Sequence, residues 1–524
     1  MSTWTRRFLA AWVGVVTAGA LVACGGASDG PGAAPGAAGP AGPPVPGGTA
    51  TFLVYTEPAR LDPAALVNSS TADSTIGNAL YGQLLVDDPA SGGVVPRLAE
   101  SLTTTDGLDW VLNLRDGVTF SDGSPLDAAA VVANWNRHKD RAVGSRSASA
   151  AQTVAAATPA GRTVTIRLTE PNRQFPQLVV NSAMNWIASP AALQGGTGAF
   201  DANPVGAGPF VLREWRRQDQ LVLARNSRYY DPPRPYLDQL VVKAIPDNES
   251  RLSTLQSAGA DAAIANVEMA GRAGQADLWV AKDELNGITA NIFNTRKAPF
   301  DDPAVRRAVV QAIDLDGLTE VLYKGHEQPP RAMFRETAAL HESGLDFVRF
   351  DRDAAQREFD RLAAAGTPLS FTLTVLNLSE TVTMAQAVQA QLQGYRNVTV
   401  AVQAVDSSTR AAQLANGNFD VVNVNMAFGD PEPLLYQSLK TGSPQNYSGI
   451  TDPQLDAALL DGRTSGDLPG RKDAYKRVQQ RWNELNPAIP ISSLASLVVV
   501  RPETGGIGFY GNGSVVVDGV WKAS

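Results

Sequence analysis

Alternating apolar and polar residues predict β-strands through the first half of the chain. Residues 108–120 contain two alternating runs separated by Asp116 and Gly117, a pair that favours tight turns, and they predict a β-hairpin. The same two-residue period, typical of strands with one buried face, occurs at residues 49–55, 163–168, 220–224 and 239–245.

Two helices are expected to begin at a polar cap followed by proline. In residues 121–138, Ser124 is the predicted N-cap and Pro125 the first helical residue. Asp302 and Pro303 are expected to have the same roles later in the chain. Proline suits the first helical position because its missing N–H would have no partner there.

The second half of the chain predicts alternating strands and helices. Strands are expected at 288–295, 369–376, 398–405 and 419–426, and helices at 382–395 and 409–418. This order is typical of a sheet whose strands are joined by helical crossovers. A helix-rich stretch at 452–486 is followed by an extended segment at 489–501. The chain is therefore expected to leave one domain, build a second and return.

The N-terminus predicts secretion and attachment to a membrane. Arg6 and Arg7 precede the uncharged run 8–23, which is short for a membrane span but fits a signal peptide. The run ends in LVAC, which resembles the lipobox of bacterial lipoproteins, so Cys24 is the expected lipidation site; the alternative is an ordinary buried cysteine. Residues 25–48 are mostly Gly, Ala and Pro and predict a tether that reaches about 25–30 Å.

Composition predicts a soluble globular body after the tether. The chain has 524 residues, of which 44% are hydrophobic and 18% charged, and it has no second long apolar run. This length suffices for two or three domains. The net charge of -8 argues against nucleic acid as a partner, because nucleic-acid binding needs clustered Lys and Arg. With Cys24 lipidated, no thiol would remain for a disulfide.

The candidate motifs for catalysis, metal binding or cofactor binding lack the neighbouring elements or the residue spacing that these functions need. Residues 26–30 match G-x-S-x-G but lack the strand and helix that this motif requires. Residues 506–511 match G-x-G-x-x-G, yet a turn and a strand are expected after them. His138, His326 and His341 are widely spaced and are expected to be surface or capping residues. No catalytic residue, metal or cofactor is therefore expected.

Four segments together resemble the extracytoplasmic solute-binding proteins of ABC importers, in the family 5 class that includes dipeptide- and oligopeptide-binding proteins. They are 94–135, 204–230, 293–314 and 446–463, the last followed by NPAIPI. The resemblance implies an α/β fold of two lobes, the type II periplasmic-binding-protein fold. Expected boundaries are a signal peptide at 1–23, a tether at 24–48, lobe I at 49–288 with an extra subdomain near 81–178, lobe II at 289–495, and a return to lobe I at 496–524. The hinge is expected at 288–294 and 493–499.

The resemblance also implies the function. A lipid-anchored monomer on the outer face of the bacterial cytoplasmic membrane would capture a peptide or peptide-like solute by lobe closure. It would then deliver the solute to the permease subunits of an ABC importer. Alternatives are a binder of another solute, such as a sugar, glycoside, opine or metal chelate, or a ligand-sensing lipoprotein without transport. A secreted hydrolase would need a nucleophile and a base that the sequence does not place.

The expected ligand site departs from the peptide-binding pattern. In peptide-binding members an Asp a few residues before an Asp-Pro pair holds the peptide ammonium. Here the pair is Asp430 and Pro431, and the position three residues earlier is Ala427. Asp430 either takes over this role or is a turn residue before Pro431. A neutral or anionic solute, or a peptide with a blocked amine, is therefore expected.

The remaining candidate contacts lie in three segments. Asn425 is expected to donate or accept hydrogen bonds, and Met426 and Phe428 to give apolar contact. Tyr55 and Glu57 follow the first strand, where α/β sheets present loops to ligands. Asn185 and Trp186 precede a strand-like segment, and the amphipathic Trp186 ring suits a wet cleft; each candidate is otherwise ordinary core or loop structure.

Overall fold

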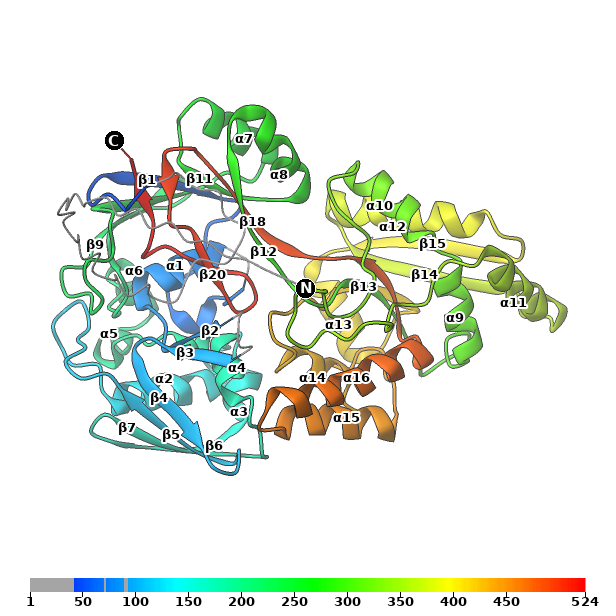
Figure 1. The fold of residues 1–524 in the computed structure, drawn as a ribbon, viewed down its shortest axis with the longest axis horizontal. Helices are drawn as coiled ribbons and strands as arrows, with labels where there is room; N and C mark the ends of the chain where they lie inside the picture. The colour runs from blue at the N-terminus through cyan, green and yellow to red at the C-terminus, as the bar shows by residue number, and fades with distance from the viewer. Residues whose placement is uncertain (1–41, 70–71, 89–92, 524) are drawn as a thin grey trace, which may run out of the picture. The chain divides into compact units, whose positions relative to one another are not determined.

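The first of two large sheets combines strands from both ends of the chain. The computed structural model describes residues 42–69, 72–88 and 93–523, so Cys24 and the expected signal peptide lie outside the described residues. β1 is parallel to β10 and β11, and β18 pairs antiparallel with β11 and β12 (Figure 1). Across the sheet the described strands are β12 (Trp279–Glu284), β18 (Ala495–Val500), β11 (Ala262–Ala265), β1 (Thr49–Val54), β10 (Gln239–Ala244), β9 (Gln220–Arg225) and β8 (Phe210–Arg216).

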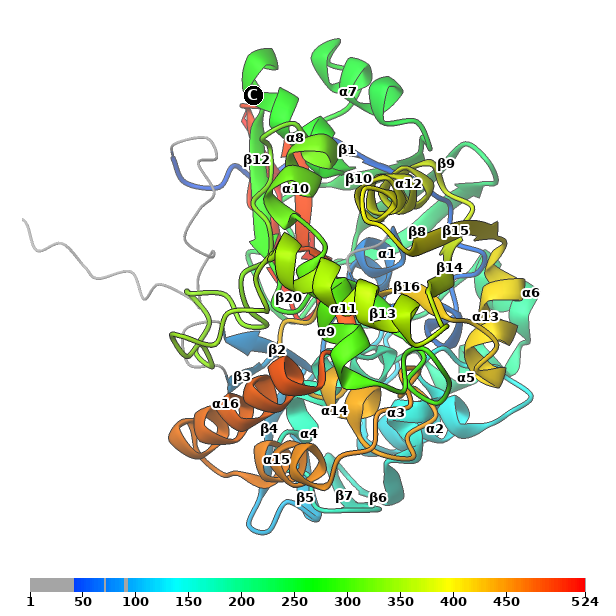
Figure 2. The ribbon, with the colours of Figure 1, turned by 90° about the vertical axis from the view of Figure 1, so that its right-hand side faces the viewer.

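The second large sheet confirms the predicted alternation of strands and helices. β14 lies parallel to both β15 and β16, and it is joined to them through α12 (Ser379–Gln393) and α13 (Ser407–Asn416). α12 packs against β14 and β15 (Figure 2). The order of described strands is β15 (Val398–Val405), β14 (Leu369–Leu376), β16 (Val421–Asn425), β13 (Thr289–Phe293) and β17 (Ala488–Ser492).

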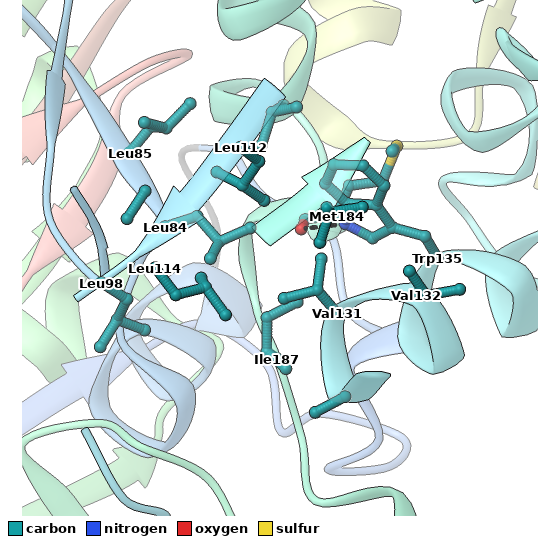
Figure 3. Close-up of a cluster of buried hydrophobic side chains, with 14 of the residues drawn as sticks. Leu84, Leu85, Leu98, Leu112, Leu114, Val131, Val132, Trp135, Met184 and Ile187 are labelled. Atoms are coloured by element: carbon teal, nitrogen blue, oxygen red, sulfur yellow. Dashed lines mark hydrogen bonds between the residues drawn. The ribbon is translucent and has the colours of Figure 1, made fainter. Parts of the chain in front are cut away.

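A third sheet has its own hydrophobic core. Its described strands are β4 (Ala99–Thr104), β5 (Asp109–Leu114), β7 (Thr163–Leu168) and β6 (Val154–Ala160). Leu112 and Leu114 of β5 face Val131 and Trp135 of α2 (Ala128–Lys139), as Figure 3 shows. The buried Trp135 indole donates a hydrogen bond to the Met184 carbonyl at 2.9 Å, so its one polar atom is satisfied.

Two local expectations in this region were wrong. Gly117 has the expected positive φ of 72°, but residues after it form no strand, and β5 pairs with β4 and β7 instead. α2 begins at Ala128 with Asp127 as its N-cap. The Ser124 carbonyl accepts the Phe120 N–H in a turn, so Ser124 and Pro125 precede the helix.

The other predicted cap is confirmed. Asp302 caps α9 (Pro303–Gln311) by accepting the Ala304 N–H at 2.8 Å, and Pro303 is the first helical residue. Residues 508–516 form β20 (Gly508–Tyr510), a turn and β21 (Ser514–Val516). The turn and strand expected after the G-x-G-x-x-G match are thus present.

The remaining elements surround these sheets. None of the described helices is long and apolar enough to cross a membrane. β2 (Leu85–Asp88) and β3 (Gly93–Pro96) form one short two-stranded sheet, and β19 (Thr504–Gly505) and β22 (Trp521–Lys522) form another. The other helices are α1 (Ala72–Tyr81), α3 (Ala148–Gln152), α4 (Phe175–Val180), α5 (Pro190–Gln194), α6 (Thr197–Ala202), α7 (Asn248–Gln256), α8 (Val267–Ala273), α10 (Leu315–Tyr323), α11 (Arg352–Ala364), α14 (Leu434–Leu439), α15 (Pro453–Thr464) and α16 (Leu468–Leu485).

Two short connections join the first sheet to the second. β12 leads into β13 through residues 285–288, and β17 leads into β18 through residues 493–494. The Leu285 N–H donates to the Leu494 carbonyl at 2.9 Å, so the connections are bonded to each other. The first connection ends before most of the expected hinge at 288–294, because residues 289–293 already belong to β13.

Acidification is expected to destabilise the fold through His138, which is buried and not on the surface as predicted. Burial lowers the pKa of His138 from 6.5 to about 4. Between these values the unfolded chain binds the proton more tightly, so stability falls as pH drops from 6.5 to 4, by up to about 3 kcal/mol. Thermal unfolding of the natural chain and of His138→Gln at pH 7 and pH 4.5 should show the smaller loss in the variant. Equal losses would contradict this role.

Candidate functional site

The segment that follows β16 is bonded to one of the two connections between the sheets. Phe428 and Asn286 exchange two backbone hydrogen bonds of 2.8 and 2.9 Å, and the Met426 N–H donates to the Ile288 carbonyl at 2.8 Å. The Asn286 side chain adds a bond to the Gly429 carbonyl at 2.9 Å. The segment 425–430, which holds five predicted ligand residues, therefore starts beside this connection.

Within this segment only Asn425 has an exposed side chain. Its Oδ1 accepts the Ala427 N–H at 2.7 Å, and the residue is exposed at the end of β16. Ala427 is 7% exposed and Met426 is 4% exposed. Phe428 is fully buried and packs against Phe334 with ring centroids 5.7 Å apart. The expectation that Met426 and Phe428 give apolar contact to a ligand is therefore wrong, because both side chains fill the core below the segment.

Asp430 is held by an ion pair. Both of its carboxylate oxygens lie 2.9 Å from the Nη2 atom of Arg471 on α16. Oδ1 also accepts the N–H of Glu432 at 3.0 Å, which confirms the turn role that was the alternative for this residue. A carboxylate that is already paired with Arg471 is a poor partner for a ligand ammonium.

Glu432 is fully buried two residues later. Its Oε1 accepts hydrogen bonds from Arg463 Nη2 at 2.8 Å and from Asn172 Nδ2 at 3.0 Å. Burial raises the pKa of Glu432, although the Arg463 charge opposes this effect. Residues 429–433, which we call the GDPEP loop, thus contain two carboxylates that each pair with an arginine.

Asn185 and Trp186 are structural residues and line no cleft, contrary to expectation. Both are fully buried. The Asn185 side chain bonds the Leu85 N–H and carbonyl at 2.9 Å each. The Trp186 indole donates to Asn78 Oδ1 at 2.9 Å, and its ring covers Gly77 so closely that a Cβ there would lie 2.7 Å away.

The two candidates after β1 differ. Glu57 accepts hydrogen bonds from Trp215 Nε1 at 2.7 Å and from the Gln218 N–H at 2.9 Å, so it fixes the turn between β8 and β9. Tyr55 is half-buried at the end of β1. Burial raises the pKa of Tyr55, and the negative charge of Asp73 adds to the rise.

Sequence reasoning missed two carboxylates that come from distant strands. Asp283 lies on β12 and Asp87 on β2. The pKa of Asp283 is raised to about 7, mainly by burial and also by the charge of Asp87, while Arg335 opposes both effects. Burial also raises the pKa of Asp87, which accepts the Gly511 N–H at 2.7 Å. No local motif marks either residue, because each depends on partners more than 50 residues away.

A family model described as bacterial extracellular solute-binding proteins, family 5 (middle), matches residues 93–448. The chain belongs to this family. The match spans more than half of its length. The family resemblance expected from the four sequence segments is thereby confirmed, and the matched region includes the connection 285–288 and the segment 425–430.

Known relatives agree with this assignment. The glutathione-binding protein GsiB of Shigella boydii serotype 4 (strain Sb227) is 27% identical over 416 residues, which cover 75% of this solute-binding protein and 79% of GsiB. The oligopeptide-binding protein AppA from Bacillus subtilis, in complex with a nonapeptide, has a TM-score of 0.75 at 21% identity, covering 92% of this chain and 100% of AppA. NikA from Brucella suis, in complex with Fe(III)-EDTA, has a TM-score of 0.77 at 24% identity, covering 91% and 100%. The two-lobe type II fold is confirmed.

Replacing Asp283 should stabilise this solute-binding protein at alkaline pH. The raised pKa means that the stability of the protonated form is present below the ordinary pKa of 3.8 and is lost as pH rises through about 7. Asp283→Asn should therefore raise the unfolding temperature more at pH 8 than at pH 5. The corresponding gain in the free energy of unfolding should not exceed about 4 kcal/mol. Asp116→Asn, at an exposed site, is the matched control. Equal effects of Asp283→Asn at both pH values would contradict the raised pKa of Asp283.

Proposed function

We propose that this protein captures a peptide or peptide-like solute outside the cytoplasmic membrane and delivers it to an ABC importer. The observation that carries the proposal is the family match together with a candidate ligand segment that is bonded to the hinge. In this proposal lobe I comprises residues 49–288 and 496–524, with an extra subdomain near 81–178, and lobe II comprises 289–495. The protein acts by binding and does no covalent chemistry.

The proposed ligand lies between Tyr55, at the end of β1, and Asn425, at the end of β16. Asn425 is exposed and Tyr55 is half-buried, whereas the carboxylates of Glu57 and Asp430 are already bonded to neighbouring residues. A ligand that touches both lobes binds only the closed arrangement well, so it stabilises closure by the difference in its affinity for the two arrangements. Closure around the ligand requires no cofactor.

The proposed ligand has no free ammonium at the position where peptide-binding members hold one. Ala427 supplies no carboxylate, and Asp430 and Glu432 are paired with Arg471 and Arg463. An ammonium enclosed without a carboxylate partner would cost several kcal/mol. A neutral or anionic solute, or a peptide whose amine is blocked, avoids this cost.

Calorimetric titration with matched peptides tests the ligand class. Unmodified di- to pentapeptides should bind no more tightly than about 100 μM, which corresponds to about 5.5 kcal/mol. Ala427→Asp should improve affinity for free amines more than for their acetylated forms, because it restores the missing charge. Ala427→Asn, of nearly the same shape without the charge, should not.

Submicromolar binding of an ordinary peptide by the natural chain would overturn this ligand class. Loss of that binding in Asp283→Asn would then place the ammonium at Asp283. Retention of binding would point to Asp430 or Glu432, and the Asp430→Asn and Glu432→Gln variants would separate these two.

Attachment is proposed to depend on Cys24. The lipobox-like LVAC and the Gly/Ala/Pro-rich tether support a lipid anchor, with the body of the protein outside the membrane. Cys24→Ala should abolish labelling by a radioactive fatty acid in cells and release the protein from the membrane fraction. A variant that remains fully with the membranes would contradict the anchor.

A further inference from the structure

Three asparagine side chains from other parts of the chain bind the GDPEP loop. Asn172 Nδ2 donates to Glu432 Oε1 at 3.0 Å, and Asn181 Nδ2 donates to the Glu432 carbonyl at 3.3 Å. Asn512 Oδ1 accepts the Gly429 N–H at 2.9 Å. Asn172 and Asn181 flank α4, and Asn512 lies in the turn between β20 and β21. Side chains of α4, β20 and β21 pack in the cores of the first and third sheets. The GDPEP loop follows β16 of the second sheet.

The GDPEP loop is fixed from its own side by α15 and α16. Arg463 near the end of α15 pairs with Glu432, and Arg471 in the first half of α16 pairs with Asp430. All four charged side chains are at most 10% exposed. The ion pairs therefore hold the loop in one shape, so its acceptors and its Gly429 N–H are already placed for the asparagines.

Backbone groups extend the contact beyond the loop. The Arg173 N–H donates to the Arg463 carbonyl at 3.0 Å, and Gln174 Nε2 donates to the Ser465 carbonyl at 3.0 Å. The contact thus joins residues 172–181, from the side of the third sheet, to two segments on the side of the second sheet. These bonds can exist only while the two sides are together.

We propose that these contacts form a clasp that favours lobe closure before any ligand binds. This inference rests on the proposed two-lobe function. Residues 425–428 run directly into the GDPEP loop, so engagement of the clasp also fixes the segment that includes Asn425. The clasp is incomplete, since the buried Glu432 Oε2 atom has no hydrogen-bond partner among the described residues. That deficit weakens the closed contact and keeps closure reversible.

Hydrogen exchange of the ligand-free, full-length chain tests the clasp without knowledge of the ligand. Asn172→Asp keeps the Oδ1 atom that accepts the Gln174 N–H, but it replaces the donor to Glu432 with a carboxylate oxygen. The Arg173 and Gly429 amides should both exchange at least about tenfold faster, because one lost charge-assisted bond plus repulsion exceeds that factor. Gly429 is the decisive reporter, since it bonds Asn512 and not position 172.

A second substitution should act in the same direction without adding a charge. Asn181→Ala removes the asparagine donor to the Glu432 carbonyl and leaves the Arg463 pair intact, so both amides should again exchange faster, by about threefold or more for one neutral hydrogen bond. Asn203→Asp adds the same charge at an exposed site and should change neither amide. Protected amides in β14 report that each variant is folded.

The outcomes are decisive for the clasp. Unchanged exchange of Gly429 in folded Asn172→Asp would overturn it. If that variant fails to fold, Asn512→Ala must speed exchange at Arg173, and unchanged exchange there would overturn the clasp equally. Either negative result leaves the solute-binding proposal standing, because no ligand takes part in the measurement.

Discussion

The backbone of the connection 285–288 is the constraint on which the candidate site depends. Residues 285–288 are bonded to 493–494 through Leu285 and Leu494, and the same connection bonds residues 426–429. Backbone groups of this candidate segment are used on the connection, so its main chain is held against residues 285–288. In the proposed function, a ligand that contacts Asn425 would therefore act close to the connection between the two sheets.

The buried ion pairs fix the conformation of the GDPEP loop more than they stabilise the fold. Removing charges from water costs free energy that pairing only partly returns, so pairs such as Glu432 with Arg463 add little net stability. They do make the GDPEP loop intolerant of other conformations, since a buried carboxylate left unpaired costs about 3–5 kcal/mol. The loop can thus serve as a rigid surface for the asparagines that bind it.

Local patterns predicted the fold well and the site less well. Strands such as β14 and the Asp302 cap depend on short-range periodicity and on one side chain near its own helix, so the sequence contains their signal. The hairpin predicted at Asp116 does not form, because β5 pairs with β4 and β7 instead. Trp186 was assigned to a cleft because amphipathic rings suit wet sites, whereas its burial follows from Gly77, more than 100 residues earlier.

The residues that organise the GDPEP loop had no detectable sequence signal. Asn172 and Glu432 are separated by 260 residues, and neither lies in a motif. The resemblance to peptide-binding members, anchored on Asp430 and Pro431, predicts that Ala427 stands where those members have a carboxylate, and this assignment stays a prediction. A family pattern can thus locate a substitution whose structural setting no single-sequence argument supplies.

Native mass spectrometry of the purified chain, mixed with fractionated small-molecule extracts, tests the central claim that this protein binds a solute without altering it. The account predicts that one fraction adds a single ligand mass per chain, and that denaturation returns the same compound unchanged. A compound returned with a different mass, or the absence of any one-to-one complex across all fractions, would contradict it.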